Sequence, residues 1–148
     1  MLVKKLQTLR AERERGEHGF TLIELLVVVV IIGILIAIAI PLYLNYQKGA
    51  KNSTAASDTR NAVAAVEACY AENSNAYPAN PAAAPAAGAA VTLTCGSSTQ
   101  TLNVSPDNVL TYNKGTTGYT VLTVAGNPGT QKYTYDSLTG KTTSAPKP

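Results

Sequence analysis

The chain has 148 residues, 45% of them apolar, and a formal net charge of +3. Residues 1–19 supply +2 of this charge, so the rest carries about +1, which is no electrostatic footprint for nucleic acid. The chain's single histidine is His18, and from residue 20 onward the chain has neither clustered carboxylates nor a glycine-rich loop before a helix. The groups needed for acid–base catalysis and for nucleotide binding are therefore missing, and we predict no enzymatic activity and no cofactor.

Residues 1–19 form a charged leader with more basic than acidic side chains. The 40 residues after Pro41 are not comparably basic. Lys and Arg beside the first apolar segment favour the cytoplasmic side, so we expect the leader in the cytoplasm and the rest outside. A plain signal anchor would explain this bias equally well. The basic residues are Lys4, Lys5, Arg10, Arg13 and Arg15.

Residues 20–44 are predicted to form a membrane-spanning helix. Between Leu22 and Leu44 the only acid or base is Glu24. About 20 helical residues, at 1.5 Å each, cross the hydrocarbon core of a bilayer. A cleaved secretory signal fits less well, because its small-residue cleavage site would follow the apolar run, whereas Gly19 precedes it.

The junction of leader and apolar segment reads G-F-T-L-I-E-L-L-V-V from Gly19 to Val28. At every position this motif resembles the precursors of type IV pilins and the related pseudopilins. The resemblance covers about the first 45 residues in detail. It implies that a membrane-embedded prepilin peptidase cuts between Gly19 and Phe20 and methylates the new amine of Phe20. It also implies that Glu24 is needed for methylation and assembly.

The resemblance further implies a function. The leading hypothesis is a structural subunit, the major pilin, of a type IV pilus, which forms a homo-oligomeric helical filament with the help of an assembly platform and motor. The filament would serve adhesion, motility or DNA uptake, and the precursor would lie in the inner or cytoplasmic membrane. The alternatives are a pseudopilin of a type II secretion system, a DNA-capturing competence pilin, and an anchor that never assembles.

The presence of the Glu24 carboxylate in an apolar segment also needs a physical explanation. A carboxylate at the centre of a spanning helix costs roughly 2.5–3.5 kcal/mol, and less near an end. In a bundle of staggered subunits Glu24 can pair with the Phe20 amine of a neighbour, and breaking a buried pair costs about 3–5 kcal/mol. The alternative is an interaction of Glu24 with the dipole of its own helix, worth roughly 0.3–1 kcal/mol.

Gly33 and Pro41 are helix breakers within this segment. Proline lacks the amide donor and its ring clashes with the carbonyl of Ala37, while glycine costs about 1 kcal/mol relative to alanine. The resemblance suggests that the stretch between them is helical in the membrane and loses helix in the filament. A fixed kink is the alternative.

Residues 45–76 are predicted to continue the helix as an amphipathic segment. A stripe of small and apolar residues recurs at spacings of four and three, and charged residues occupy the other side. We expect the stripe to pack under the chain's own sheet or against other helices. The stripe is Ala55, Thr59, Ala62, Val66 and Cys69, and the charged side is Lys51, Asp58, Arg60, Glu67 and Glu72.

The remaining residues predict a loop and then a sheet. Residues 77–90 are rich in proline and alanine and are expected to be a surface loop. Residues 91–148 are expected to form an antiparallel sheet of three to five strands that depends on the helix for burial. Strands are predicted at 91–95, 101–104, 109–113, 118–125 and 131–136, with a final edge strand or a loose tail after a turn at 138–141. The fold class is thus α+β and type IV pilin-like.

Cys69 and Cys95 are the two cysteines. In an exported domain they suggest one disulfide that ties the Pro/Ala loop and the first strand to the helix. Its 26-residue separation would stabilise the domain by about 3 kcal/mol in the chain-entropy model. Many pilins place such a bond nearer the C-terminus, and two reduced, buried thiols are the alternative.

Calcium and nucleic acid are two further ligands to consider. Some pseudopilins bind calcium in a C-terminal loop, but Asp107 and Asp136 are too sparse for an oxygen cage, and we predict no metal. Lysines and tyrosines of the sheet could form a modest patch for nucleic acid, although solvated lysines and core tyrosines are the favoured interpretation. These residues are Lys114, Lys132, Lys141, Lys147, Tyr112, Tyr119, Tyr133 and Tyr135.

Overall fold

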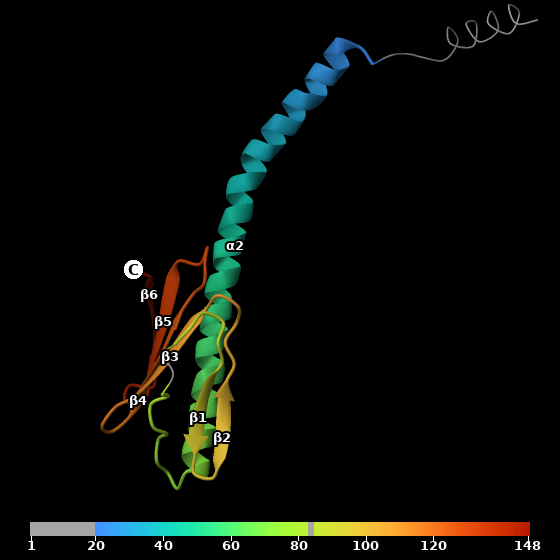
Figure 1. Cartoon of the computed structure of the whole chain (residues 1–148). Coiled ribbons are helices and arrows are strands. Elements are labelled where there is room, and N and C mark those ends of the chain that lie inside the picture. The colour runs from blue at the N-terminus through green and yellow to red at the C-terminus, as the bar shows by residue number, and fades with distance from the viewer. Residues whose placement is uncertain (1–19, 83–84) are drawn as a thin grey trace, which may run out of the picture. The chain divides into compact units, whose positions relative to one another are not determined.

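The computed structural model describes residues 20–82 and 85–148. The leader, with His18 and Gly19, lies outside this part of the chain. Within these described ranges, one helix, α2 (Leu22–Glu72), precedes six strands (Figure 1). The chain divides into two compact units, one ending at Pro41 and the other beginning at Leu42. The strands are β1 (Val91–Cys95), β2 (Ser98–Leu102), β3 (Val109–Lys114), β4 (Tyr119–Val124), β5 (Gln131–Asp136) and β6 (Lys141–Pro146).

Helix α2 ends at Glu72, four residues before the predicted end at Ala76. The next backbone amide, of Asn73, still donates to the Cys69 carbonyl. Ser74 and Asn75 then adopt positive φ angles of 52° and 60°. The left-handed conformation, which asparagine tolerates better than most residues, ends the helix without a proline or glycine.

The predicted stripe on α2 is the buried face of the helix. Its five residues are at most 1% exposed and face the strands. Thr59 illustrates how close the packing is, because its hydroxyl donates to the Ala55 carbonyl and contacts the Thr123 hydroxyl on β4 at 2.9 Å. Small side chains on the helix let the sheet approach to this distance.

Asp58 was predicted on the charged, exposed side of α2, and this is wrong. It is 5% exposed. Position 58 lies three residues from Ala55 and four from Ala62, so helical geometry places it on the buried face. Its carboxylate accepts hydrogen bonds from the Ser105 amide and hydroxyl and from the Asn108 side chain, at 2.7–2.9 Å. These donors replace the water that burial removes.

The C-terminal strands form a four-stranded antiparallel sheet in the order β3-β4-β5-β6. Burial alternates along β4, with Tyr119, Val121 and Thr123 buried and the intervening residues half-buried, as the alternation predicts. After a turn at 137–140 the chain returns as β6, which pairs with β5. The final segment is therefore an edge strand and not a loose tail.

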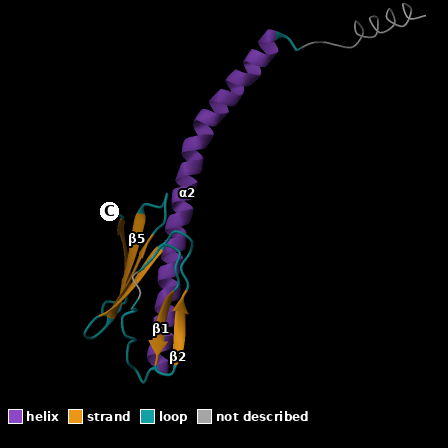
Figure 2. Ribbon diagram, in the orientation of Figure 1, coloured by secondary structure: helices purple, strands orange, loops and turns teal. Residues whose placement is uncertain are grey.

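Strands β1 and β2 form a second, two-stranded sheet, whereas a single sheet of three to five strands was expected. The second strand begins at Ser98 and not at Thr101, because Gly96, with φ of +63°, allows a tight turn directly after β1. Residues 98–100 are polar and show no alternation of apolar and polar side chains, so the sequence pattern did not predict the start of this strand. Figure 2 shows the hairpin and the larger sheet beside the C-terminal part of α2.

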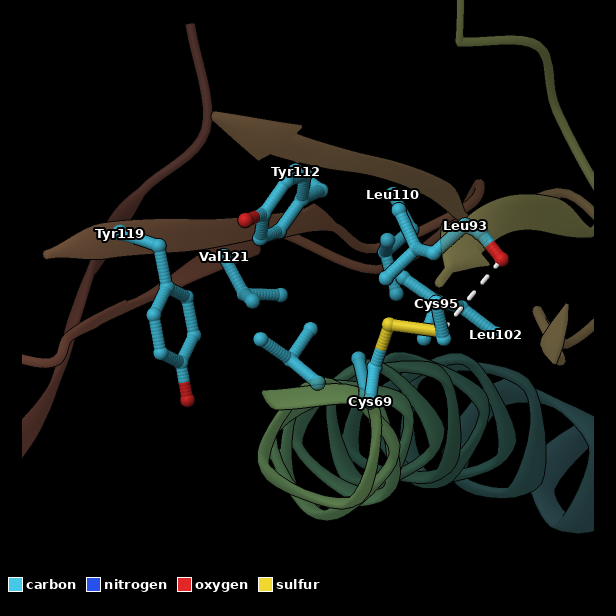
Figure 3. Packing of buried hydrophobic residues seen from close by; sticks show 10 residues of the cluster. Cys69, Leu93, Cys95, Leu102, Leu110, Tyr112, Tyr119 and Val121 are labelled. Atoms are coloured by element: carbon cyan, nitrogen blue, oxygen red, sulfur yellow. Dashed lines mark hydrogen bonds between the residues drawn. A yellow bond between two sulfur atoms is a disulfide. The ribbon is translucent and has the colours of Figure 1, made fainter. Parts of the chain in front are cut away.

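A disulfide joins Cys69 of α2 to Cys95 at the end of β1, with their Cα atoms 5.1 Å apart. Both residues are buried, and Figure 3 shows the bond between the helix and the strands. Leu93, Leu102 and Leu110 lie in the same cluster. The two thiols are thus paired, and β1 is tied to the end of α2, as was predicted for the first strand.

Tyrosines complete the core. Tyr112 and Tyr119 are 2% exposed, and their ring centroids lie 5.8 Å apart. The Tyr119 hydroxyl donates to Glu67, and the Tyr112 hydroxyl donates to the carbonyl of Pro78 in the Pro/Ala loop. Burial, with a smaller contribution from Tyr77 and Glu67, raises the pKa of Tyr112 to about 12. Burial and the hydrogen bond to Glu67 raise the pKa of Tyr119 further.

We expect replacement of both cysteines by alanine to lower the free energy of unfolding by about 3 kcal/mol, because the unfolded chain loses a 26-residue cross-link. Urea unfolding of the full chain in detergent micelles, followed by circular dichroism, measures this change. A matched control is Thr94→Ala, an exposed position in β1, which should stay within about 0.5 kcal/mol. An equal effect of both changes would contradict the prediction.

Stability should fall as the pH rises from about 10, the ordinary tyrosine pKa, toward about 12, the pKa of folded Tyr112. In this window the unfolded chain loses the proton while the folded chain keeps it, which costs up to about 1.4 kcal/mol per pH unit. Tyr112→Phe should therefore flatten the pH dependence of the unfolding free energy measured in urea. Parallel curves for the two proteins would show that Tyr112 is not responsible.

Candidate assembly segment

Apart from Glu24, the surface of α2 is apolar from Leu22 to Leu44. Its large hydrophobic side chains are exposed along this stretch, from Leu22 at 83% to Leu44 at 45%. By length and composition α2 is the one helix among the described residues that could cross a membrane. Surfaces of this size on a soluble monomer mark a membrane or protein contact. The segment therefore requires lipid or other helices as its surroundings.

The polar start of this segment is a closed hydrogen-bonded unit. The Glu24 carboxylate accepts from the Thr21 amide at 2.8 Å and from the Thr21 hydroxyl at 2.9 Å. The Glu24 amide in turn donates to the Thr21 hydroxyl at 3.3 Å and to the Thr21 carbonyl at 3.1 Å. This reciprocal arrangement is a capping box, which gives hydrogen-bond partners to backbone amides at the start of the helix.

The sequence contains the signal for this cap, although the helix dipole and the amine of a neighbouring subunit were the only partners predicted for Glu24. The residues Thr21-Leu22-Ile23-Glu24 match the pattern of a capping box before an apolar run. Phe20 immediately precedes the capping threonine and is 82% exposed. An amine created at Phe20 would thus lie one residue from a group that already donates to Glu24.

Gly33 and Pro41 are both within α2, which continues as α-helix through each of them. A side chain at Gly33 would meet no atom within 4 Å, so the glycine is not required by packing inside this subunit. The helical form is one of the two states that were expected for this stretch.

The residues that were considered for calcium and nucleic acid have other partners in the described part of the chain. No group of three potential metal ligands occurs among the described residues, and Asp107 pairs with Lys51 at 3.0 Å. Lys147 donates to Asn127 and to the Ala125 carbonyl. The sheet tyrosines Tyr112, Tyr119 and Tyr135 lie in or against the core.

Comparison with known proteins places these features in a family. The model named "Prokaryotic N-terminal methylation motif" matches residues 15–40. The type IV narrow pilus major component PilA5 of Thermus thermophilus is 36% identical over 111 residues, which are 72% of this chain and 96% of PilA5. The chain belongs to the type IV pilin family.

Other relatives match this chain over shorter stretches. The type IV major fimbrial protein FimA of Dichelobacter nodosus is 48% identical over 60 residues, so the match spans 40% of this chain and 38% of FimA. The type II secretion system core protein G of Pseudomonas aeruginosa is 42% identical over 66 residues, 46% of that protein. No solved structure matches the chain significantly.

We expect Thr21→Val to fray the first turn of α2, because valine removes the capping hydroxyl at a cost of about 1 kcal/mol. Amide hydrogen exchange of Glu24 and Leu25, measured by NMR in detergent micelles, should become about fivefold faster. Thr21→Ser keeps the hydroxyl and is the matched control. Equal exchange in all three proteins would mean that the box does not hold the helix start.

Proposed function

We propose that this chain is a structural subunit of a type IV pilus, without enzymatic activity of its own. It is made as a membrane precursor, with residues 1–19 in the cytoplasm and α2 across the inner or cytoplasmic membrane. It then polymerises through residues 20–44 into an extracellular filament, while residues 45–148 face outward.

The observation that carries this proposal is the exposed apolar surface from Leu22 to Leu44, which begins at a capped carboxylate inside a methylation-motif match. A helix that only anchored the protein would need no acid there, since a carboxylate in lipid is costly. A surface that leaves the membrane must instead be covered by copies of itself.

The same motif specifies how the precursor is processed. Prepilin peptidase cuts between Gly19 and Phe20 and methylates the Phe20 amine. Glu24 then sets the axial register by pairing with the Phe20 amine of a neighbouring subunit, and the capping box holds the carboxylate until that pair forms. The helix between Gly33 and Pro41 is the stretch that can loosen during packing.

A pseudopilin of a type II secretion system is the second candidate, favoured by the similarity to core protein G. That match spans less than half of the relative, whereas the match to the pilus component PilA5 spans nearly all of it. The pilus is therefore the first choice. Adhesion, twitching motility and DNA uptake are the uses to be tested once filaments are isolated.

The decisive experiment isolates sheared surface filaments and determines the N-terminus and mass of their main subunit. We expect a chain that begins at methylated Phe20. Processed protein found only in the membrane would favour the pseudopilin, and a retained leader in cells with the peptidase would overturn the proposal.

Variants of Glu24 distinguish a role in setting the axial register from a role in capping the helix, with filament yield as the measurement. Glu24→Gln keeps an acceptor for the Thr21 hydroxyl but removes the charge, and Glu24→Ala removes both. If the charge pairs with a neighbour, both variants should reduce filament yield more than 100-fold, in line with about 3–5 kcal/mol per buried pair. Normal filaments from Glu24→Gln would leave capping as the role of Glu24.

A further inference from the structure

Two tyrosines mark the point where the apolar surface of α2 ends. Tyr43 is 61% exposed and Tyr46 is 70% exposed, in contrast to the buried tyrosines of the sheet. The Tyr43 hydroxyl accepts a hydrogen bond at 2.7 Å from the side chain of Gln47, one turn further along. Neither ring belongs to a ring–ring contact among the described residues.

The composition changes at the same place. Leu42 and Leu44 are the last large aliphatic residues of the exposed surface, and Asn45, Gln47 and Lys48 follow them. Tyrosine has an apolar ring and a polar hydroxyl, and it is enriched where hydrocarbon meets the lipid headgroups. A lysine beside it can extend its ammonium group to lipid phosphates.

Lys48 is suited to this role and Lys51 is not. The Lys48 side chain is exposed. Lys51 donates to the Asp107 carboxylate at 3.0 Å and to the Pro106 carbonyl at 3.2 Å, so its charge is used inside the domain.

The spacing from Glu24 fits the thickness of a bilayer. Tyr43 follows Glu24 by 19 residues, which at 1.5 Å each make about 28 Å of helix, and Tyr46 follows it by about 33 Å. The hydrocarbon core is about 30 Å thick. If the tyrosines lie at the outer boundary, Glu24 and its capping box lie at the inner boundary, where the cost of the carboxylate is low.

We propose that Tyr43, Tyr46 and Lys48 form an interfacial anchor that binds the headgroup layer on the outer side of a phospholipid bilayer. The anchor sets the depth of α2 and thereby presents the Gly19–Phe20 junction at the inner surface. This inference rests on the proposed membrane precursor. Its partner is lipid; a second copy of the chain on the same rings is the competing occupant.

The chain contains no tryptophan, so a single replacement gives an unambiguous fluorescent reporter. Tyr43→Trp, Tyr46→Trp and Ile34→Trp are prepared in the full chain and placed in phosphatidylethanolamine–phosphatidylglycerol vesicles. Brominated lipids with bromine at different depths then quench each reporter according to its depth. Ile34 lies near the middle of the Glu24–Tyr43 interval and serves as the deep reference.

We expect the two tyrosine positions to be quenched best by shallow bromine and to lie about 13–18 Å closer to the surface than position 34. Equal depths at all three positions, or full access to an aqueous quencher at 43 and 46, would overturn the anchor. Quenching that changes with the protein-to-lipid ratio would also overturn it, because it would identify a second copy as the occupant.

A second measurement tests whether the anchor sets depth. With the reporter Ile40→Trp, the double replacement Tyr43→Leu/Tyr46→Leu extends the apolar run outward, so the reporter should move toward the bilayer centre by a few ångströms. The Tyr43→Phe/Tyr46→Phe pair keeps the rings and should shift it less. An unmoved reporter in the leucine variant overturns the depth-setting role.

These experiments distinguish failure of the proposed membrane precursor from failure of the interfacial anchor. If the Ile34→Trp reporter is not deeply buried, α2 does not span the bilayer and the proposed precursor is wrong. If that reporter is deep but the tyrosine positions are not shallow, only the anchor is wrong.

Discussion

The fold of residues 42–148 depends on the close contact between one face of α2 and the strands. Neither sheet can bury a core alone, because the apolar face of a single sheet must be covered by another element. The small residues of the helix stripe bring the strands close enough for Thr59 to meet Thr123. The leucines and tyrosines of the strands can then fill the space beside the helix. The helix is therefore an integral part of the core.

Periodicity in the sequence predicted the elements that repeat regularly. The four- and three-residue spacing from Ala55 to Cys69 identified the buried helix face, and alternation identified β4 and its inward side. Asp58 was misplaced because a charged residue was assumed to face water, although its position on the helix is buried. Only the tertiary structure reveals that Ser105 and Asn108, about fifty residues away, supply its donors.

The sequence indicated which residues to consider at the start of α2 but not their geometry. The motif from Gly19 to Val28 predicts roles for Phe20 and Glu24, and both residues lie within the matched methylation motif. The bonds between Thr21 and Glu24 show how a lone subunit satisfies a carboxylate at the edge of an apolar helix. The separate β1–β2 hairpin was missed because its second strand is built from serine, threonine and glutamine, whose pairing depends on the partner strand.

The burial of the disulfide has a consequence for the life of the protein outside the cell. Cys69 and Cys95 are at most 1% exposed, beneath the hairpin that they secure. Thiol–disulfide exchange needs direct attack on a sulfur atom, so dissolved thiols reach this bond only when the hairpin opens. The cross-link must accordingly form before the hairpin closes over it. Once the hairpin has closed, exchange with dissolved thiols can proceed no faster than the hairpin opens.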